Sequence, residues 1–303
     1  MAVLLSFSCI LAAPLVAQTT IGGNPCNSAS ANGPYAVSIN GRQVTAAGSF
    51  TNVFQGNGTA TFDGLSAVTI TLTTDTNQSV ATPVTWSGTY SVQSNCAGVI
   101  TITKGGSATL NLAMYANGAD FLVTGNDASY SYSGTGNAQP VGCSAGLVSG
   151  VYTFNASGYT LSGTSVTSAA TLVGLLQFDG QSHVTVNVNV SPASANPASD
   201  TLTGSYSISS NCLGSATLSD SKGNSYVMSL SAEDVTPVAS PLYVSNIIVG
   251  LAQNSKLVVN GAGHALYGQP AATSTAAIRP TKSPVNTRGS EALALVDHRG
   301  GRS

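Results

Sequence analysis

Charge is what this sequence has least of. Lysine, arginine, aspartate and glutamate make up only 7% of its 303 residues, against roughly 25% in an average soluble domain. Threonine, serine, asparagine and glycine supply the polar surface instead, which is typical of extracellular β proteins. Most of the few lysines and arginines lie beyond residue 270, so no basic patch with interleaved aromatics exists and a nucleic-acid partner is not expected.

The sequence also lacks the patterns of helical and membrane proteins. No stretch follows the period of an amphipathic helix, and no apolar run is long enough to cross a bilayer as a helix. An outer-membrane barrel would need strands of about 9–11 residues and aromatic girdles. Aromatic residues make up only 6% of the chain and several expected strands are shorter, so we do not expect a membrane-spanning protein.

Residues 1–17 have the composition of an export signal. Ala2–Leu5 and Ile10–Val16 are apolar, and Leu15-Val16-Ala17 supplies small residues ahead of a cleavage point before Gln18. The positive charge that usually begins such a signal is missing, and an uncleaved anchor is the alternative. Because the apolar run is short and interrupted, we expect export of the protein to the periplasm, the extracellular space or the cell surface.

What the chain does contain is a long internal repeat. The stretch Gly88-Thr-Tyr90-Ser-Val-Gln-Ser-Asn95-Cys96 returns as Gly204-Ser-Tyr206-Ser-Ile-Ser-Ser-Asn211-Cys212. Phe62-Asp63-Gly64 returns as Phe178-Asp179-Gly180 at the same offset. A period this long corresponds to a whole domain and not to a solenoid repeat.

We therefore expect two similar domains, residues 26–136 and 143–267. Residues 134–142, which include a proline, are the expected linker between them. Residues 268–303 are rich in alanine, threonine, serine, proline and arginine and show no strand pattern. This composition predicts a disordered tail.

The cysteines agree with export. Once Cys9 leaves with the signal, four remain, and four allow three pairings. The repeat favours Cys26–Cys96 and Cys143–Cys212, each closing a loop of about 70 residues, worth roughly 4 kcal/mol in the chain-entropy account. Four free buried thiols are the alternative. A metal site is not expected, because no C-x-x-C or nearby histidine completes a ligand set.

Short runs rich in threonine, valine and tyrosine predict strands throughout both repeats. Val68, Ile70 and Leu72 alternate with threonines, which predicts one apolar and one hydroxyl-bearing face. Gly56-Asn57-Gly58 and Gly261-Ala262-Gly263 are expected to be hairpin turns. The strands expected in the first repeat are residues 35–39, 44–54, 58–62, 67–74, 84–92, 98–103, 108–115, 121–124 and 129–133.

Eight or nine short strands joined by tight turns favour an up-and-down meander. Closing such a sheet into a barrel removes its exposed edges. We therefore predict an all-β fold of two tandem antiparallel up-and-down β-barrels, with two-sheet β-sandwiches as the alternative.

Three aromatic residues are candidates for contact with a ligand. Trp86 is the only tryptophan and could stack on a sugar, but the second repeat has Leu202 in its place, so an apolar core position explains both. Tyr90 and Tyr206 are the other candidates, and they occupy the same position of the repeated motif.

No catalytic residue, cofactor or metal ligand can be nominated. Asp63 and Asp179 are kept in both repeats, but a glycine follows each, which indicates a turn and not a glycosidase pair. His183 corresponds to Ala67 and is expected to be an exposed strand residue. Glu233-Asp234 is expected in a solvated loop, because it lacks the ordered oxygen ligands of a calcium loop.

Taken together, these motifs resemble those of a group of secreted bacterial proteins. Their repeats are written G-x-Y, then F-D-G, then G-x-Y-x-V with a following C-x-G. The first repeat fits at Gly33-Pro-Tyr35, Phe62-Asp63-Gly64, Gly88-Thr-Tyr90 and Cys96-Ala-Gly98, and the second at the corresponding positions. More loosely, the layout is similar to calycin and allene-oxide-cyclase-type small barrels. The resemblance implies fold and export and carries no catalytic residue.

The sequence thus predicts an architecture and a compartment but no activity. We expect a secreted, non-catalytic protein that is structural or binds a small apolar ligand or a glycan, because an eight-stranded barrel is either filled or holds one small ligand. The alternatives are a barrel enzyme of the isomerase or dirigent type and a cell-surface adhesive module.

Overall fold

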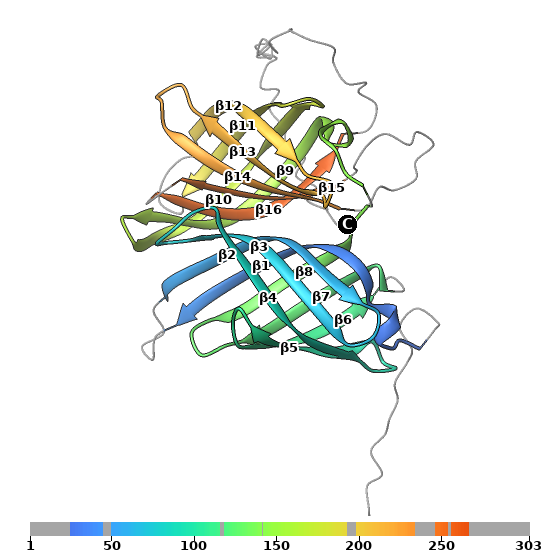
Figure 1. Cartoon of the computed structure of the whole chain (residues 1–303). Helices are drawn as coiled ribbons and strands as arrows, with labels where there is room; N and C mark the ends of the chain where they lie inside the picture. The colour runs from blue at the N-terminus through green and yellow to red at the C-terminus, as the bar shows by residue number, and fades with distance from the viewer. Residues whose placement is uncertain are drawn as a thin grey trace, which may run out of the picture. The chain divides into compact units, whose positions relative to one another are not determined.

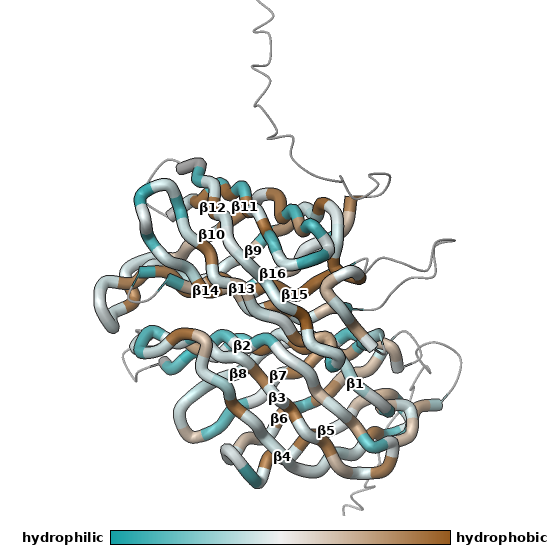
Figure 2. The backbone as a smooth tube through the Cα atoms, turned by 45° about the horizontal axis from the view of Figure 1, so that its top comes forward, coloured by the Kyte–Doolittle hydropathy of each residue, from teal (hydrophilic) through white to brown (hydrophobic). Residues whose placement is uncertain are grey.

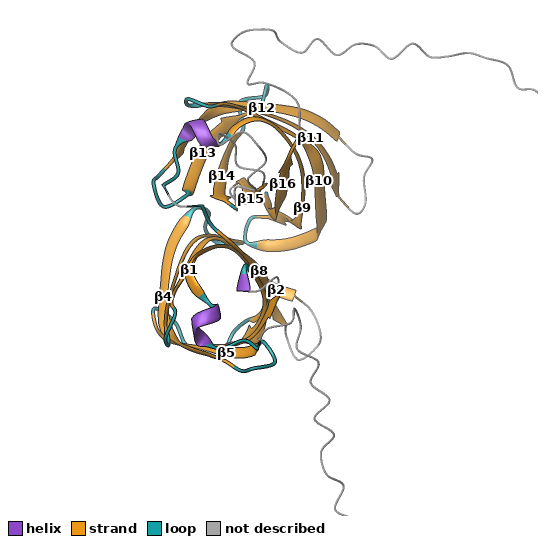
Figure 3. Ribbon diagram, turned by 90° about the vertical axis from the view of Figure 1, so that its right-hand side faces the viewer, coloured by secondary structure: helices purple, strands orange, loops and turns teal. Residues whose placement is uncertain are grey.

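Two closed eight-stranded barrels make up the described part of the protein (Figures 1 and 3). The computed structural model describes residues 25–44, 50–115, 118–140, 142–192, 198–233, 246–253 and 256–266. In each barrel every strand pairs with its neighbour in the chain, and the last strand pairs with the first. The prediction of two tandem antiparallel up-and-down barrels is therefore confirmed over sandwiches.

Barrel 1 holds the first eight strands and barrel 2 the next eight, and a short 3-10 turn precedes each barrel: η1 (Ser28–Ser30) and η3 (Ala145–Leu147). The strands of barrel 1 are β1 (Asn32–Val44), β2 (Phe50–Asp63), β3 (Ala67–Thr76), β4 (Thr82–Val92), β5 (Ala97–Lys104), β6 (Ala108–Tyr115), β7 (Asp120–Asn126) and β8 (Ser131–Ala138). Those of barrel 2 are β9 (Ser149–Ser162), β10 (Ser165–Asp179), β11 (His183–Pro192), β12 (Ala198–Ile208), β13 (Leu213–Ser219), β14 (Ser225–Ala232), β15 (Asn246–Gln253) and β16 (Leu257–Ala265).

Alternation along the strands places the apolar side chains inside. In β3, Val68, Ile70 and Leu72 are buried while the intervening threonines are more exposed. Figure 2 shows the same alternation of hydrophobic and hydrophilic residues along many strands. Each barrel therefore has its own apolar core, as the period of two predicts.

The two stretches expected to be glycine turns lie inside strands instead. Gly56-Asn57-Gly58 is in the middle of β2, and Gly261-Ala262-Gly263 is in β16. A Cβ atom on Gly58 would lie 1.8 Å from the carbonyl oxygen of Thr71 in the neighbouring strand. Glycine is needed there because it lets the strands coil closely around the barrel. The turn expectation was wrong, and a single strand replaces the two expected around residue 56.

Both expected disulfides are present. Cys26 is bonded to Cys96 and Cys143 to Cys212, and the Cα atoms lie 4.9 Å apart in each pair. Each bond ties the segment before a barrel to the turn between its fourth and fifth strands. Disulfides persist in oxidising compartments, which agrees with a location outside the cytosol.

The structure describes part of the expected linker but neither end of the chain. The expected signal, residues 1–17, and the expected tail, residues 268–303, lie outside the described residues. Strand β8 continues to Ala138 and so takes up half of the expected linker, because Gly136 packs directly against Phe121. Among the described residues, no helix is long and apolar enough to cross a membrane.

Candidate functional site

The interior of barrel 1 is filled by its own side chains. Tyr35, Phe62, Tyr90 and Phe121 pack edge to face or tilted, with ring centroids 4.8–5.6 Å apart. A Cβ atom added to Gly136 on the inner wall would lie 2.2 Å from the Phe121 ring. There is no room for even one more methyl group at this position, so this end of the barrel is a packed core.

Tyr90 and Tyr206 close one end of each barrel. The Tyr90 hydroxyl donates to the carbonyl oxygens of Ser28 and Ala31, both at 2.9 Å, on either side of turn η1. The Tyr206 hydroxyl donates in the same way to Ala145 at 3.1 Å and Val148 at 2.9 Å, around turn η3. Each tyrosine therefore holds a 3-10 turn across the barrel end, next to the disulfide.

Trp86 belongs to a second aromatic cluster that only barrel 1 has. Its ring stacks on Phe54 with centroids 5.8 Å apart and meets Tyr132 edge to face at 5.7 Å. Only 6% of Trp86 is exposed. The structure thus places Trp86 in the core, and it does not bring the three candidate aromatics together at one surface.

Barrel 2 is filled by a smaller aromatic group and many aliphatic side chains. Tyr152, Phe178 and Tyr206 repeat the packing at the closed end, with centroids 5.6 and 4.9 Å apart. Toward the other end, Leu172, Leu202 and other buried aliphatic residues replace the second aromatic cluster. Polar groups meet these cores where the Tyr132 hydroxyl donates to Asp127 Oδ2 at 2.6 Å and the Tyr226 hydroxyl donates to Asp220 Oδ2 at 3.3 Å.

The repeated aspartates form turns, as expected. Asp63 Oδ1 accepts three main-chain N–H groups at 2.8–2.9 Å, from Leu65 to Ala67. Asp179 accepts the three equivalent groups and also contacts His183 Nδ1 at 2.9 Å. Partial desolvation raises the pKa of Asp179, but these hydrogen bonds, first that of the His183 N–H, outweigh it and lower the pKa to about 2. His183 is exposed, with 78% of its side chain accessible.

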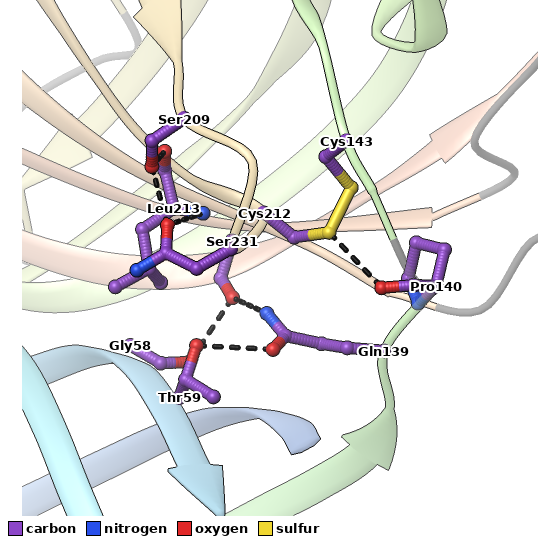
Figure 4. The surroundings of a disulfide bond; sticks show 10 residues. Gly58, Thr59, Gln139, Pro140, Cys143, Ser209, Cys212, Leu213 and Ser231 are labelled. Carbon is purple, nitrogen blue, oxygen red and sulfur yellow. Dashed lines mark hydrogen bonds between the residues drawn. A yellow bond between two sulfur atoms is a disulfide. The ribbon is translucent and has the colours of Figure 1, made fainter. Parts of the chain in front are cut away.

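A buried polar seam joins the two barrels, which fall within one compact unit. Thr59 Oγ1 donates to Gln139 Oε1 at 3.0 Å, Gln139 Nε2 donates to Ser231 Oγ at 2.9 Å, and Ser231 Oγ donates to the Gly58 carbonyl at 3.0 Å (Figure 4). These side chains point outward from their barrels yet are almost fully buried. Each barrel therefore buries polar groups of the other in matched hydrogen bonds.

Asn57 lies at the centre of this seam. Its amide oxygen accepts from the Ser229 hydroxyl at 3.1 Å and from the Gly250 N–H at 2.6 Å, while its nitrogen donates to Asn260 Oδ1 at 2.7 Å. The hydrogen-bonding partners assign this orientation of the amide. Asn260 Nδ2 in turn donates to Ser38 Oγ at 2.8 Å. The seam thus involves strands β1 and β2 of barrel 1 and β14 to β16 of barrel 2, and it reaches β8 through Asn137 and β9 through Ser157.

Glu233 is buried, not solvated as expected. Only 6% of it is exposed, and its carboxylate accepts from Asn137 Nδ2 at 2.5 Å across the seam. Burial raises the pKa of Glu233, and the Asn137 hydrogen bond and nearby His264 act in the opposite direction. The expectation failed because the covering residue comes from the other barrel, far away in sequence.

A second buried acid lies beside the seam. Asp75 is 4% exposed and its Oδ1 accepts the Ala81 N–H at 2.7 Å. Desolvation raises its pKa to about 6, against the effect of that hydrogen bond. Asp75 of β3 pairs with Gln55 of β2. Gln55 Nε2 donates to the Ser157 carbonyl at 3.2 Å, and Gln55 Oε1 is buried without a hydrogen-bond donor.

Three depressions open on the described surface of the barrels. A depression of about 610 Å³ on barrel 2 crosses β16, β9, β10 and β11 and is lined by Asn155, Thr171 and Val173 among others. A neighbouring depression of about 540 Å³ crosses β10 to β12. A third, of about 520 Å³, lies on barrel 1 and is lined by Asn111, Thr124, the turn between β7 and β8, Arg42 and the core residue Tyr132. Amides and hydroxyls occur in all three linings, and Trp86, Tyr90 and Tyr206 line none of them.

Sequence reasoning missed the seam and these outer faces. The one available signal was a set of amides, such as Gln55 and Asn57, at outward strand positions where threonine is otherwise usual. Its meaning depends on the neighbouring barrel, which a strand pattern cannot reveal. Among the described residues, no group of three or more histidines, cysteines or acids could hold a metal ion.

The fold and these contacts define a disulfide-bonded tandem pair of filled eight-stranded antiparallel barrels. No protein-family model matches the chain, and a search of the curated proteins found no similar protein.

Proposed function

We propose that the protein is a secreted, non-catalytic structural protein that acts through the outer faces of its barrels. The observation that carries this proposal is the filled interior of both barrels. A carrier needs an internal space and a barrel enzyme needs convergent polar groups at a cavity, so the packed aromatic and aliphatic cores support a structural role over either. Two disulfides and a sparsely charged, hydroxyl-rich composition support work in an oxidising compartment.

Titration with apolar fluorescent probes and fatty acids tests the absence of a carrier site. The disulfide-intact protein is expected to give no saturable binding. Phe121→Ala serves as the positive control, because an apolar cavity of this kind takes up small aromatic molecules. Should Phe121→Ala not fold, Leu172→Ala opens a smaller cavity in barrel 2. Saturable binding of one probe per barrel to the unmodified protein would overturn the proposal.

Export is tested separately. The full chain, expressed in a cell with a general secretory pathway, is expected outside the cytosol as a mature form that begins at Gln18. Intact mass spectrometry reads both the cleavage and the two disulfides. A cytosolic, uncleaved and reduced product would contradict the secreted part of the proposal.

A further inference from the structure

The two barrels contact each other through faces that do not correspond. We call the outward side chains of β1 and β2 the leading face of a barrel, and those of β14 to β16 the trailing face. In the seam, the leading face of barrel 1, with Asn57 and Thr59, contacts the trailing face of barrel 2, with Ser231 and Ile248. The contact extends to β8 of barrel 1 through Asn137 and to β9 of barrel 2 through Ser157. It leaves outward residues of β10, such as Val173, and of β7, such as Leu122, exposed.

The unused faces can be identified by register. In barrel 1 the Met114 N–H donates to the Cys96 carbonyl at 2.9 Å, and in barrel 2 the Ala232 N–H donates to the Cys212 carbonyl at 3.0 Å. In the next strand Met114 pairs with Phe121, and Ala232 pairs with Ile247. Strands β6 to β8 of barrel 1 therefore correspond to β14 to β16. Asn137 of β8 already bonds Glu233 in the seam, so the outward side chains of β6 and β7 are the unused part of this trailing face.

The unused leading face follows in the same way. Both Phe-Asp-Gly turns begin after equivalent strands, so β9 and β10 of barrel 2 correspond to β1 and β2. Val173 and Leu175 precede Asp179 as Asn57 and Thr59 precede Asp63.

These two unused faces hold most of the large apolar side chains that the described residues expose. Val173 is 58% and Leu175 36% exposed on the leading face, and Leu122 is 47% and Tyr115 39% exposed on the trailing face. Leu122 corresponds to Ile248, an outward residue of β15 that is only 2% exposed. Apolar surface is thus concentrated at the positions that are covered in the seam.

The same faces are hollowed. The depression of about 610 Å³ includes Val173 and Thr171 of the unused leading face. The depression of about 520 Å³ includes Asn111 and Thr124 of the unused trailing face. Asn111 and Thr124 correspond to Ser229 and Gly250, the seam residues that receive Asn57.

We propose that the protein binds a second copy of itself by placing the unused leading face of one copy against the unused trailing face of the other, repeating the seam between chains. Val173 and Leu175 would take the places of Asn57 and Thr59, and Ala113 that of Ser231, so that apolar contacts replace the hydrogen bonds of the seam. Because each copy has one face of each kind, two copies that pair reciprocally make two such contacts at once, whereas a contact whose rotation does not close would add further copies end to end. This inference deepens the proposed structural function and depends on the outer faces being its working surfaces.

Sedimentation velocity over a range of concentrations tests the proposal on the disulfide-intact mature chain. A concentration-dependent dimer is expected for the unmodified protein. Val173→Asp and Leu122→Asp are each expected to raise its dissociation constant at least tenfold, with Leu175→Asp and Tyr115→Asp as a second pair if either variant misfolds. Val99→Asp is the matched control, because Val99 is a similarly exposed apolar residue on β5, outside both faces, and its dimer should be unchanged.

Mixing the two variants gives the sharpest result. Val173→Asp retains an intact trailing face and Leu122→Asp an intact leading face, so an equimolar mixture should recover a heterodimer through one intact contact. A contact between identical faces would show no recovery. The inference is overturned if the protein is a monomer at every concentration, or if both variants dimerise as tightly as the unmodified protein. It is also overturned if a neutral oligosaccharide binds these faces saturably on a monomer. A monomer that binds no apolar probe contradicts this inference alone, whereas probe binding inside a barrel contradicts the proposed function.

Discussion

Single hydroxyl groups hold the closed ends of the barrels. The Tyr90 and Tyr206 hydroxyls each serve two carbonyl oxygens beside a 3-10 turn, and those carbonyls have little access to water at Ala31 and Val148, which are fully buried. Removing the donor therefore leaves a buried acceptor unpaired, which costs more than the hydrogen bond itself gains.

We expect Tyr90→Phe and Tyr206→Phe each to lower the free energy of unfolding by about 1–2 kcal/mol. Urea denaturation followed by tryptophan fluorescence or circular dichroism measures this change. Tyr115→Phe is the control, because Tyr115 is exposed, and it should change little. If both core variants are as stable as the unmodified protein, the hydroxyls do not hold the turns.

Asp75 makes the stability of the protein depend on pH. Its folded-state pKa of about 6 lies above the unfolded value of about 3.9. The protonated carboxyl therefore contributes its full stabilisation of the folded state below pH 3.9, and this stabilisation is lost as the pH rises through 6. The shift of roughly two units corresponds to about 3 kcal/mol. We expect the free energy of unfolding to fall by about 2 kcal/mol of this between pH 4.5 and 8.

Asp75→Asn tests this dependence. The amide can still accept the Ala81 N–H and can donate to Gln55 Oε1, the buried acceptor opposite it. The variant should be more stable than the unmodified protein at pH 7.5, and its stability should fall less between pH 4.5 and 8. Equal pH slopes in the two proteins would show that Asp75 does not titrate in the folded state.

At the scale of the strand, glycine decides how closely neighbours approach. Gly174 occupies in β10 the position that Gly58 occupies in β2, and a Cβ atom on it would lie 1.9 Å from the Asn187 carbonyl oxygen. The strand can admit a side chain there only by separating from β11. The glycine therefore serves barrel closure and not a turn.

We expect Gly174→Ala to destabilise the protein by about 2 kcal/mol or more, since overpacking against backbone cannot relax through a side chain. Thermal and chemical denaturation measure it. Gly146→Ala is the control, because nothing lies closer than 3.8 Å to the added Cβ atom and the residue is in turn η3. A Gly174→Ala protein as stable as this control would contradict the close approach of the strands.

How far the sequence predicts the structure also differs from element to element. The alternation of Val68, Ile70 and Leu72 predicted a strand with one buried face, and the repeat predicted both disulfides, because these signals are local or copied. The place of Gly58 inside a strand could not be predicted, since it depends on the Thr71 carbonyl across the sheet. The burial of Glu233 depends likewise on Asn137 of the other barrel.

At the scale of the whole molecule, the seam couples the two barrels. Asn57 and Ser231 are buried between them and fully occupied by hydrogen bonds. A charge placed in this seam would lose its hydration without gaining a partner of opposite sign, which is strongly unfavourable. The two barrels should consequently unfold together while the seam is intact.

Asn57→Asp tests this coupling. In differential scanning calorimetry the unmodified protein should unfold in a single transition. The variant should lose about 3 kcal/mol and unfold in two steps at neutral pH. Asn187→Asp, an exposed asparagine on β11, is the matched control and should keep one transition. Two transitions already present in the unmodified protein would show that the seam does not couple the barrels.

The central claim is that both barrels are filled, so that only their outer faces are available for binding. Xenon NMR tests it most directly, because xenon enters apolar cavities and its chemical shift reports the occupied fraction. We expect no saturable xenon site in the unmodified protein and one saturable site in Phe121→Ala, in the cavity that the removed ring leaves. Saturable xenon binding inside the unmodified barrels, unaffected by Phe121→Ala, would contradict it.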